Sequence, residues 1–364
     1  MKATVVGAGI SGLIASKELS SLGAEVYLIE EHKTIGLPTH CGGLVAPNFW
    51  QKLGIPQKKN LVLNEYFGLS FSDGRSTFTI RTKKPLLVAV SRVLLDQYVG
   101  DLAEKEGAKL LTGERVKKVS LHKSGVKTST SSGKIFESDV VFVADGLFGQ
   151  VSNKLFPKRG RNLLFASQAV FRHSLDSSTP LVFLRKDLSE DFFAYIAPLN
   201  DEFARVGVAS SKPLTRLAIE KLAKVYNLKQ VEPYTYWGIW IGGPVGKISF
   251  YEKVFLLGDA AGFTKATTGG GIVFGSVLSR MLSRYVTSNN EAEKKLTRDR
   301  IGHLKKDLEL MLILRRMLNF FGPSFYYPIM RKVSNLREVE KIVEALDYDF
   351  LFDTSFRNTL SSFQ

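Results

Sequence analysis

Gly258-Asp259-Ala260-Ala261-Gly262, which runs on to Thr267-Thr268-Gly269-Gly270-Gly271-Ile272, is the stretch that decides the fold of this chain. It follows an apolar run over residues 254–257, which predicts a buried strand. Near the opposite end of the chain, Gly7-x-Gly9-x-x-Gly12 follows another apolar run. Together the two glycine-rich segments predict that distant parts of the chain close over one bound ligand.

The N-terminal glycines belong to a predicted strand-helix-strand unit. Residues 2–6 predict a buried strand, residues 11–22 a helix and residues 25–29 a second strand, with very short connections between them. Glycines at such positions allow a tight turn, close approach of the backbone to a pyrophosphate, and close packing of the helix on the strand. The helix directs its free N–H groups at the phosphates. Glu30 follows the second strand, where a carboxylate accepts hydrogen bonds from ribose hydroxyls. The motif predicts dinucleotide binding without separating NAD from FAD.

Composition and charge limit the remaining function classes. The chain has 364 residues, which favours two lobes over one core, and a net charge of +15 with a pI near 9.6. Such a charge favours anionic partners. Because no zinc-finger or RNA-binding motif accompanies it, we expect an anionic membrane surface rather than nucleic acid, with general solubility as the alternative explanation. The single cysteine, Cys41, excludes a disulfide framework and a cysteine-rich metal site, and we expect no metal. We expect a cytoplasmic protein without a secretory signal.

The order of predicted elements indicates an α/β fold. Residues 61–90 predict antiparallel strands around a turn at 72–75, residues 92–106 a helix, and residues 110–119 a strand. Short strand-like runs then dominate residues 160–245, which predicts a second, antiparallel lobe. The predicted boundaries are a dinucleotide-binding lobe over residues 1–60, 86–158 and 246–300, an antiparallel substrate lobe over 61–85 and 159–245, and a helical C-terminal tail over 301–364.

The tail is apolar over residues 308–329, which raises the question of a membrane span. A spanning helix needs about 20 mostly apolar residues. Arg315, Arg316 and Gly322 interrupt the run. We therefore expect a helix that packs on a lobe or lies at a membrane interface.

The second glycine-rich segment favours a flavin over NAD. Asp259 stands at the carboxyl end of a predicted strand, where it can accept a hydrogen bond from a sugar-alcohol hydroxyl; a helix N-cap is the alternative. A helix that begins after Gly271 would direct its N-terminus at an isoalloxazine ring near N1 and the C2 carbonyl. Such a helix end stabilises negative charge on the reduced ring.

The combined motifs resemble those of the FAD-dependent geranylgeranyl reductase family, within the wider class of flavoproteins similar to p-hydroxybenzoate hydroxylase. The resemblance covers about residues 1–275. It is carried by the stretch 258–272, by the cysteine loop 35–42, by Ala144-Asp145-Gly146 and by the helix start Arg92-x-x-x-Asp96. It implies a Rossmann-like FAD-binding lobe with non-covalently held FAD, beside an antiparallel substrate lobe.

The resemblance also implies a reaction. Members of the family saturate isoprenoid double bonds, so the implied substrate is a lipid with geranylgeranyl or other polyprenyl chains. Cys41 would lie near the flavin and the substrate and assist proton delivery; the alternative is a small residue in a tight loop. The family pattern has Arg before this cysteine and Glu two residues after it, where this chain has His40 and Gly43. His40 is therefore a candidate proton donor, or else a surface histidine.

A further departure lies in the substrate lobe. The family has an aromatic segment with a tryptophan before a proline, and this chain has Phe193-Ala194-Tyr195-Ile196-Ala197-Pro198. The resemblance implies that Phe193, Tyr195 and Pro198 contact the lipid chain, while the alternative is that the aromatic residues are ordinary sheet residues. Gly207 follows at the expected distance.

The predicted FAD-binding residues come from several separate segments. They are Gly7, Gly9, Ile10, Ser11, Gly12, Glu30, Glu31, Cys41, Gly42, Gly43, Arg92, Val116, Asp145, Gly146, Gly258, Asp259, Gly269, Gly270, Gly271 and Ile272.

The electron donor stays open between NAD(P)H and a ferredoxin-like protein, since a basic surface suits an acidic partner. Peripheral contact with the inner face of an anionic membrane is expected. Two rival functions remain: a flavin-dependent monooxygenase or halogenase with the same fold, and a non-catalytic flavoprotein that binds prenyl lipids.

Overall fold

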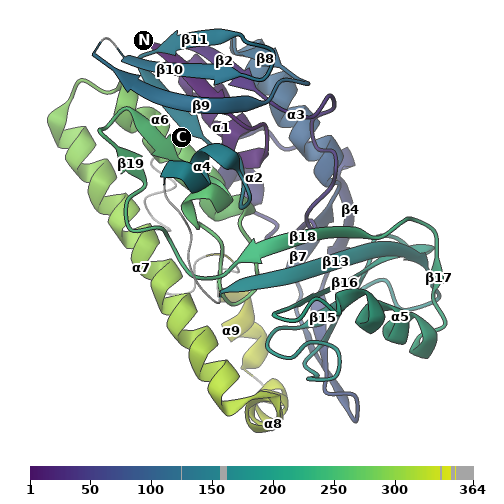
Figure 1. Cartoon of the computed structure of the whole chain (residues 1–364). Helices are drawn as coiled ribbons and strands as arrows, with labels where there is room; N and C mark the ends of the chain where they lie inside the picture. Colours follow the sequence, from purple (N-terminus) through teal and green to yellow (C-terminus); the bar gives the residue numbers. More distant parts are fainter. Residues whose placement is uncertain (124, 156–161, 337, 346–348, 350–364) are drawn as a thin grey trace.

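The chain forms a parallel sheet and a separate antiparallel sheet, with C-terminal helices beside both (Figure 1). The computed structural model describes residues 1–123, 125–155, 162–336, 338–345 and 349. The parallel sheet has the order β19 (Ser249–Phe250), β20 (Val254–Leu256), β12 (Val140–Val143), β1 (Lys2–Val6), β2 (Glu25–Ile29) and β8 (Lys109–Leu111). All neighbours are parallel except β19, which pairs antiparallel with β20.

The register of this sheet brings three sequence motifs together. Val6 of β1 is paired with Val143 of β12, which is paired with Leu256 of β20. The loops that follow these strands carry the first glycine motif, Ala-Asp-Gly and the Gly-Asp segment. Because the carboxyl ends of parallel strands lie at one edge, segments far apart in the sequence lie side by side there.

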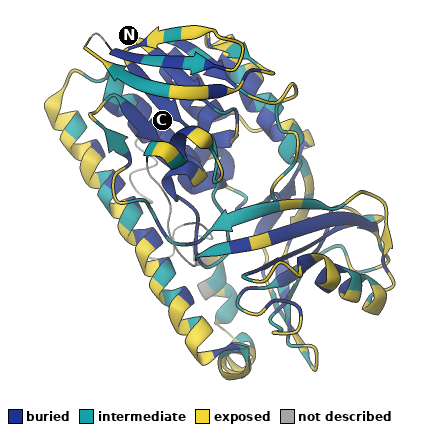
Figure 2. Cartoon of the chain, in the orientation of Figure 1, coloured by how far each residue is buried: buried dark blue, intermediate teal, exposed yellow. Residues whose placement is uncertain are grey.

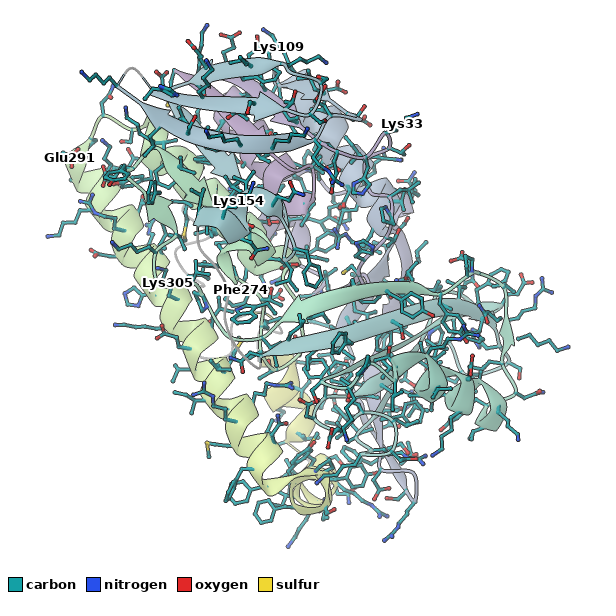
Figure 3. The ribbon with its side chains drawn as sticks, viewed as in Figure 1. Lys33, Lys109, Lys154, Phe274, Glu291 and Lys305 are labelled. Carbon is teal, nitrogen blue, oxygen red and sulfur yellow. The ribbon has the colours of Figure 1, made fainter. Side chains whose placement is uncertain are left out.

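Helices cover one face of the parallel sheet, and a three-stranded antiparallel sheet covers the other (Figure 1). The helices are α1 (Ile10–Ser21), α3 (Arg92–Lys105) and α6 (Ile272–Thr287), and the strands are β9 (Val116–His122), β10 (Gly125–Thr130) and β11 (Ile135–Ser138). Cover on both faces explains why β12 is apolar throughout and why the buried residues of β1 are apolar except for Thr4. Figure 3 shows Phe274 of α6 inside the molecule, whereas Lys109 and Glu291 lie at its surface.

Close packing of α1 on α6 depends on small side chains. The Ser279 hydroxyl donates hydrogen bonds to the Ser11 and Gly275 carbonyls, both at 2.8 Å. A Cβ added at Gly275 would lie 2.3 Å from the Ser11 hydroxyl oxygen. The N-termini of both helices are therefore held next to one another, below the motif loops.

The antiparallel sheet follows the path β17-β13-β16-β15-β14-β5-β6, and β18 pairs with β13 beside it. Its strands are β5 (Gly68–Ser72), β6 (Thr77–Arg81), β13 (Leu163–Arg172), β14 (Leu181–Phe183), β15 (Ala194–Pro198), β16 (Phe203–Ser210), β17 (Lys229–Gln230) and β18 (Thr235–Trp240). The amphipathic helix α5 (Thr215–Val225) packs Ala218, Ile219 and Leu222 on the outer face of this sheet. The opposite face is free to line a site.

A third small sheet, β3-β7-β4, connects the other two. Its strands are β3 (Leu44–Val45), β7 (Leu87–Val90) and β4 (Val62–Tyr66). β4 pairs antiparallel with β7, whereas β5 pairs with β6 and, in parallel, with β14. The predicted antiparallel segment 61–90 therefore serves two different sheets.

The structure corrects one predicted element. The run 110–119 was expected to be one strand, but it contains the end of β8 and the start of β9, which belong to different sheets. The chain turns between them because the Gly113 and Glu114 amides bond to the carbonyls of His32 and Glu30, at 2.9 and 2.8 Å.

The tail forms a long helix and two shorter ones: α7 (Glu291–Phe321), α8 (Pro323–Ser334) and α9 (Val339–Ala345). Figure 2 shows α7 buried along its inner side and exposed along its outer side. Arg315 on the inner side donates to the carbonyls of Ala266 and Asp191, at 3.2 and 2.8 Å. In the part of the chain that the structure describes, no helix is both long and apolar enough to cross a membrane.

Candidate active site

A cavity of about 920 Å³ lies where the parallel and antiparallel sheets meet. The predicted site residues that line it are Gly7, Gly9, Ile10, Ser11, Glu30, Glu31, His40, Cys41, Gly42, Gly43, Arg92, Val116, Asp145, Gly146, Phe193, Tyr195, Gly258, Asp259, Gly269, Gly270, Gly271 and Ile272. The structure thus brings the predicted cofactor and substrate residues to one cavity. Gly12 and Pro198 do not line it.

Gly12 has a packing role beneath the first glycine loop. A Cβ added at Gly12 would lie 2.0 Å from the Gly7 carbonyl oxygen and 3.2 Å from the Ala144 Cβ. A Cβ added at Gly9 would meet no atom within 4 Å. Gly12 therefore lets α1 approach β12, while Gly9 leaves its backbone open to the cavity, as close approach of a pyrophosphate requires.

Pro198 is a correction to the predicted substrate contacts. Successive side chains in a strand point to opposite faces, so Phe193 and Tyr195 share the cavity face and Pro198 does not. Pro198 is buried, and its carbonyl accepts hydrogen bonds from the Tyr66 hydroxyl at 2.5 Å and from the Asn64 amide at 3.0 Å. It ties β15 to β4 and does not line the cavity.

Two acidic residues follow β2 at the cavity. The Glu30 carboxylate accepts from the backbone amides of Ala8 and His32, at 2.7 and 2.9 Å. It therefore fixes the backbone of the first glycine loop at Ala8. Glu31 forms an ion pair with Arg115, which also lines the cavity.

Asp145, in the Ala-Asp-Gly motif, caps a helix at the cavity wall. Its Oδ2 accepts from the amides of Val151 and Ser152, at 2.9 and 3.1 Å, in the first turn of α4 (Gln150–Leu155). The motif thus fixes the backbone of the loop after β12. This loop lies between the two glycine-rich segments.

The second glycine-rich segment forms a short 3-10 helix, Gly258–Ala261, and then a loop that ends at α6. Asp259 lies within the 3-10 helix, and its Oδ1 accepts from the Thr264 hydroxyl at 2.8 Å. Gly271 occupies the N-cap of α6 without a side-chain cap. The N-terminus of a 16-residue helix therefore meets the cavity, and such an end favours negative charge on a ligand.

Buried charged side chains stabilise the loop between the 3-10 helix and α6. Lys265 exchanges backbone hydrogen bonds with Gly269 and Gly270, at 2.8 and 3.0 Å. Its ammonium group and that of Lys52 each contact a different oxygen of Asp349, both at 3.0 Å, and all three side chains are at most 4% exposed. Burial alone would raise the pKa of Asp349, but the two lysines hold it below its usual value.

The cysteine loop lies between two arginines. The Arg92 guanidinium contacts both oxygens of Asp96, at 3.0 to 3.2 Å. Burial alone would lower the pKa of Arg92, but Asp96 and then the Cys41 sulfur raise it above its usual value. From the other side, Arg205 donates to the Gly42 carbonyl at 2.5 Å. The Cys41 sulfur therefore sits beside a fixed cation, and it accepts a weak hydrogen bond from the Gly43 amide at 3.4 Å.

Gly43 has a physical reason to replace the glutamate of the family pattern. Its φ is +65°, which side chains rarely adopt, and an added Cβ would lie 2.5 Å from the Val90 carbonyl oxygen and 3.1 Å from an Arg205 nitrogen. Arg205 occupies the space that a side chain would need. In this chain the Arg205 guanidinium therefore lies directly beside Gly43.

Tyr195 reaches the cysteine loop across a gap made by Gly207. Gly207 of β16 is paired with Tyr195 of β15 on one side and with Gln168 of β13 on the other. The Tyr195 hydroxyl donates to Gln168 Oε1 at 3.2 Å, and the Gln168 amide donates to the Cys41 carbonyl at 3.1 Å. Burial raises the pKa of Tyr195, so its hydroxyl stays protonated well above neutral pH.

His40 is exposed at the rim of the cavity. Partial burial, and then the neighbouring His32, lower the pKa of His40 below its usual value. At neutral pH the imidazole is therefore mostly uncharged. An uncharged imidazole is a weaker acid than the imidazolium ion, so His40 is the weaker candidate beside Tyr195.

Gln168 and Arg205 were missed in the sequence. Each is a long polar side chain within a mostly apolar, mostly buried strand, and that mismatch was the available signal. A different set of unpredicted residues makes the apolar wall of the cavity: Leu69, Phe71, Val182 and Leu184, from β5 and β14 and the residue after it.

Comparisons with known proteins agree with these motifs. A family model described as an NAD(P)-binding Rossmann-like domain matches residues 5–51. The chain is 26% identical to digeranylgeranylglycerophospholipid reductase 2 of Methanosphaera stadtmanae, over 83% of this chain and 84% of that protein. It is 24% identical to an uncharacterised protein of Methanocaldococcus jannaschii, over 95% of this chain and 91% of that protein.

Solved structures share the fold. A geranylgeranyl bacteriochlorophyll reductase-like protein from Thermoplasma acidophilum superimposes with a TM-score of 0.83 at 16% identity, over 99% of this chain and 95% of that one. A flavin-dependent brominase has a TM-score of 0.69 at 16% identity, over 100% and 99% of the two chains. Both predictions, the fold class and FAD as the cofactor, are confirmed. By its motifs and these findings, the chain is an FAD-dependent oxidoreductase, and it is similar over most of its length to digeranylgeranylglycerophospholipid reductases.

Proposed function

We propose that this chain is an FAD-dependent reductase that saturates double bonds in the geranylgeranyl chains of lipids. One observation carries the proposal: a single cavity extends from the dinucleotide cradle, past Cys41 and Tyr195, to an apolar wall. Leu69, Phe71 and Val182 on that wall suit a hydrocarbon chain better than a polar substrate. Relatives named digeranylgeranylglycerophospholipid reductase support the same substrate class.

Bound FAD would supply two electrons as hydride, and the chain's own residues supply position and a proton. An unactivated alkene is a poor hydride acceptor, so a proton must reach the other carbon. We assign that proton to Tyr195, whose hydroxyl donates to Gln168, or to Cys41, whose backbone carbonyl accepts from the same Gln168. Tyr195 keeps its proton at neutral pH because burial raises its pKa. Gln168 orients the tyrosine hydroxyl, and Arg92 holds the sulfur of Cys41 in place.

The cofactor cradle has a separate task. Gly9 and the N-terminus of α1 would face the pyrophosphate, and Glu30 would accept hydrogen bonds from the ribose. The N-terminus of α6 would face the end of the isoalloxazine ring that becomes negative on reduction. Phe193 and Tyr195 would contact the prenyl chain.

An anaerobic experiment tests the reductase. The purified protein, loaded with FAD, is reduced with dithionite and mixed with digeranylgeranylglycerophospholipid in detergent. We expect flavin absorbance to return as the lipid gains two hydrogens per turnover, detected by mass spectrometry. Absence of reoxidation with several prenyl lipids would contradict the proposal, and would leave a non-catalytic lipid-binding flavoprotein as the better account.

The brominase likeness gives a second candidate, an oxygen-dependent flavin enzyme acting on an apolar substrate. Product mass separates the two, because a monooxygenase adds oxygen and a reductase adds hydrogen. NAD(P)H and a ferredoxin-like protein are both candidate donors. We place the enzyme in the cytoplasm, in peripheral contact with the inner face of the membrane.

A further inference from the structure

An apolar stripe runs along the outer side of α7 and continues on α8. We name it the apolar corner, since it turns where the two helices meet at Gly322. Its exposed residues are Leu310, Ile313, Met317, Phe320, Phe321, Phe325, Ile329, Val333 and Leu336. The three phenylalanines form a connected cluster, with ring centroids 5.2 Å apart for Phe320–Phe321 and 4.8 Å apart for Phe321–Phe325. Phe320 is 85% exposed.

The spacing of these residues identifies one continuous face. Leu310, Ile313, Met317 and Phe320 follow one another at intervals of three or four, and so do Phe325, Ile329 and Val333. The inner face of α7 is already occupied, because Leu304, Leu308 and Met311 are buried in the main core. The apolar corner is therefore a second face, of a kind that marks an interaction surface.

All charged residues of this segment are basic. From residue 310 to residue 336 the chain has no Asp or Glu, and its charged residues are Arg315, Arg316, Arg331 and Lys332. Arg315 is buried, while the other three are exposed beside the apolar stripe. Acidic residues reappear only at its flanks, as Glu309 and Glu338. Large apolar side chains bordered by exposed cations are typical of helices that lie at the surface of an anionic bilayer.

The apolar corner lies next to the apolar wall of the cavity. On the inner side of α8, the Tyr327 hydroxyl donates to the carbonyls of Phe71 and Ser76, at 3.3 and 2.7 Å. The Tyr327 ring contacts Phe78, which stacks on Phe71 with centroids 5.4 Å apart. Phe71 lines the cavity. A surface that contacts lipid through α8 is thus one layer of aromatic rings away from the site proposed for the prenyl chain.

We propose that the apolar corner is the surface by which this protein docks on an anionic lipid bilayer, with α7 and α8 lying at the headgroup boundary. The phenylalanine cluster would enter the boundary region, while Arg316, Arg331 and Lys332 bind lipid phosphates. The orientation rests on the proposed function in one respect: it brings the apolar wall of the cavity close to the membrane that holds a prenyl lipid.

Vesicle sedimentation tests the proposal with the full FAD-loaded chain. Vesicles of phosphatidylglycerol and phosphatidylcholine are compared with vesicles of phosphatidylcholine alone. We expect salt-sensitive binding to the anionic vesicles. Phe320→Ser with Phe325→Ser should weaken that binding about tenfold or more, and Arg331→Gln with Lys332→Gln should weaken it about tenfold.

Leu217→Ser is the matched control, because Leu217 is 60% exposed on α5, away from the apolar corner. It should bind vesicles like the unaltered chain. Flavin content and far-UV circular dichroism verify that each variant is folded. Equal binding by the Phe320/Phe325 variant and the control would overturn the proposal. So would absence of vesicle binding combined with a dimer that the same phenylalanine substitutions dissociate, because the corner would then bind a second copy of the chain.

Failure of docking and failure of the reductase are distinguishable. With detergent-dispersed prenyl lipid, the Phe320/Phe325 variant should turn over at the unaltered rate, because neither residue lines the cavity. With the same lipid embedded in vesicles, its rate should fall about tenfold. Vesicle binding without any turnover would contradict the proposed function and leave the docking surface standing.

Discussion

The two halves of the cavity are built from different chemical groups. On the cofactor side, glycine loops and the N-termini of α1 and α6 present backbone N–H groups, positioned by Glu30 and Asp145. On the substrate side, Tyr195 and its partner Gln168 project side chains from β15 and β13, the two strands that flank β16. This difference explains why the cofactor side of the cavity has a recognisable sequence motif and the substrate side does not. Backbone recognition requires glycine at defined spacings, whereas a side-chain cluster across strands requires only spatial proximity.

The largest expected effect concerns two glycines on the cofactor side: Gly12, which permits close packing, and Gly9, which leaves its backbone open to the cofactor. Gly12→Val should prevent assembly of FAD-loaded protein, because its Cβ would lie 2.0 Å from the Gly7 oxygen. Gly9→Ala should fold normally, since no atom lies within 4 Å of its Cβ and its φ is −69°, yet bind FAD about tenfold or more weakly. Thermal unfolding and flavin titration measure both. If the two variants behave alike, the distinction between the two glycines is wrong.

The second largest effect concerns the buried charged side chains that contact the loop before α6. Asp349→Asn would remove the buried carboxylate that Lys52 and Lys265 both contact, which should cost about 3–5 kcal/mol of the free energy of unfolding. The folded-state pKa of Asp349 lies below its unfolded value, so this stabilisation is present above about pH 4 and is lost as pH falls through the folded pKa. Urea unfolding at pH 7 and pH 3 checks it.

Asp101→Asn is the control for that measurement, because Asp101 is exposed on α3. Its free energy of unfolding should stay within about 0.5 kcal/mol of the unaltered chain. An Asp349→Asn variant as stable as this control at pH 7 would show that the lysines do not depend on Asp349.

On the substrate side, removal of the proton donor should slow turnover about 100-fold or more. Tyr195→Phe and Cys41→Ala are compared by the rate at which prenyl lipid reoxidises the dithionite-reduced flavin. The variant with the larger loss identifies the donor. Because the raised pKa of Tyr195 keeps it protonated, the unaltered enzyme should show no loss of tyrosine-dependent rate between about pH 6 and pH 9.

Tyr236→Phe provides the comparison, since Tyr236 also lines the cavity but is 53% exposed. It should keep nearly full activity. All three variants should bind FAD within about threefold of the unaltered affinity, because on the cofactor side the contacts come from the backbone. A rate unaffected by both Tyr195→Phe and Cys41→Ala would exclude the cluster as the proton source.

The smallest effect tests the gap that lets Tyr195 reach Gln168. Gly207→Ala would place a Cβ 2.5 Å from the Tyr195 ring, so we expect about tenfold slower turnover with the cofactor still bound. Combined with Tyr195→Phe, the substitution should add little, because both act on the same hydroxyl. Independent, multiplying losses would show that Gly207 acts elsewhere.

Much of the fold was predictable because its signals are local. The strand-helix-strand unit at the N-terminus, the strand before Gly258 and the helix after Gly271 were all predicted from apolar runs and glycines, and the structure has each of them. The run 110–119 was wrong as a single strand, since its break depends on hydrogen bonds to His32 and Glu30 from a distant segment. The parallel pairing of β5 with β14 was not predicted, because nothing local marks it.

For this protein, the sequence alone determined the cofactor and the class of fold. Backbone N–H groups can surround a dinucleotide only where side chains are missing, and missing side chains are visible as glycines. Only the tertiary structure decided that Tyr195, Gln168 and Cys41 meet, that Pro198 faces away from the cavity, and that Asp349 contacts two buried lysines. These contacts join residues from separate strands and helices, and their distances depend on register and packing, which no short stretch of sequence encodes.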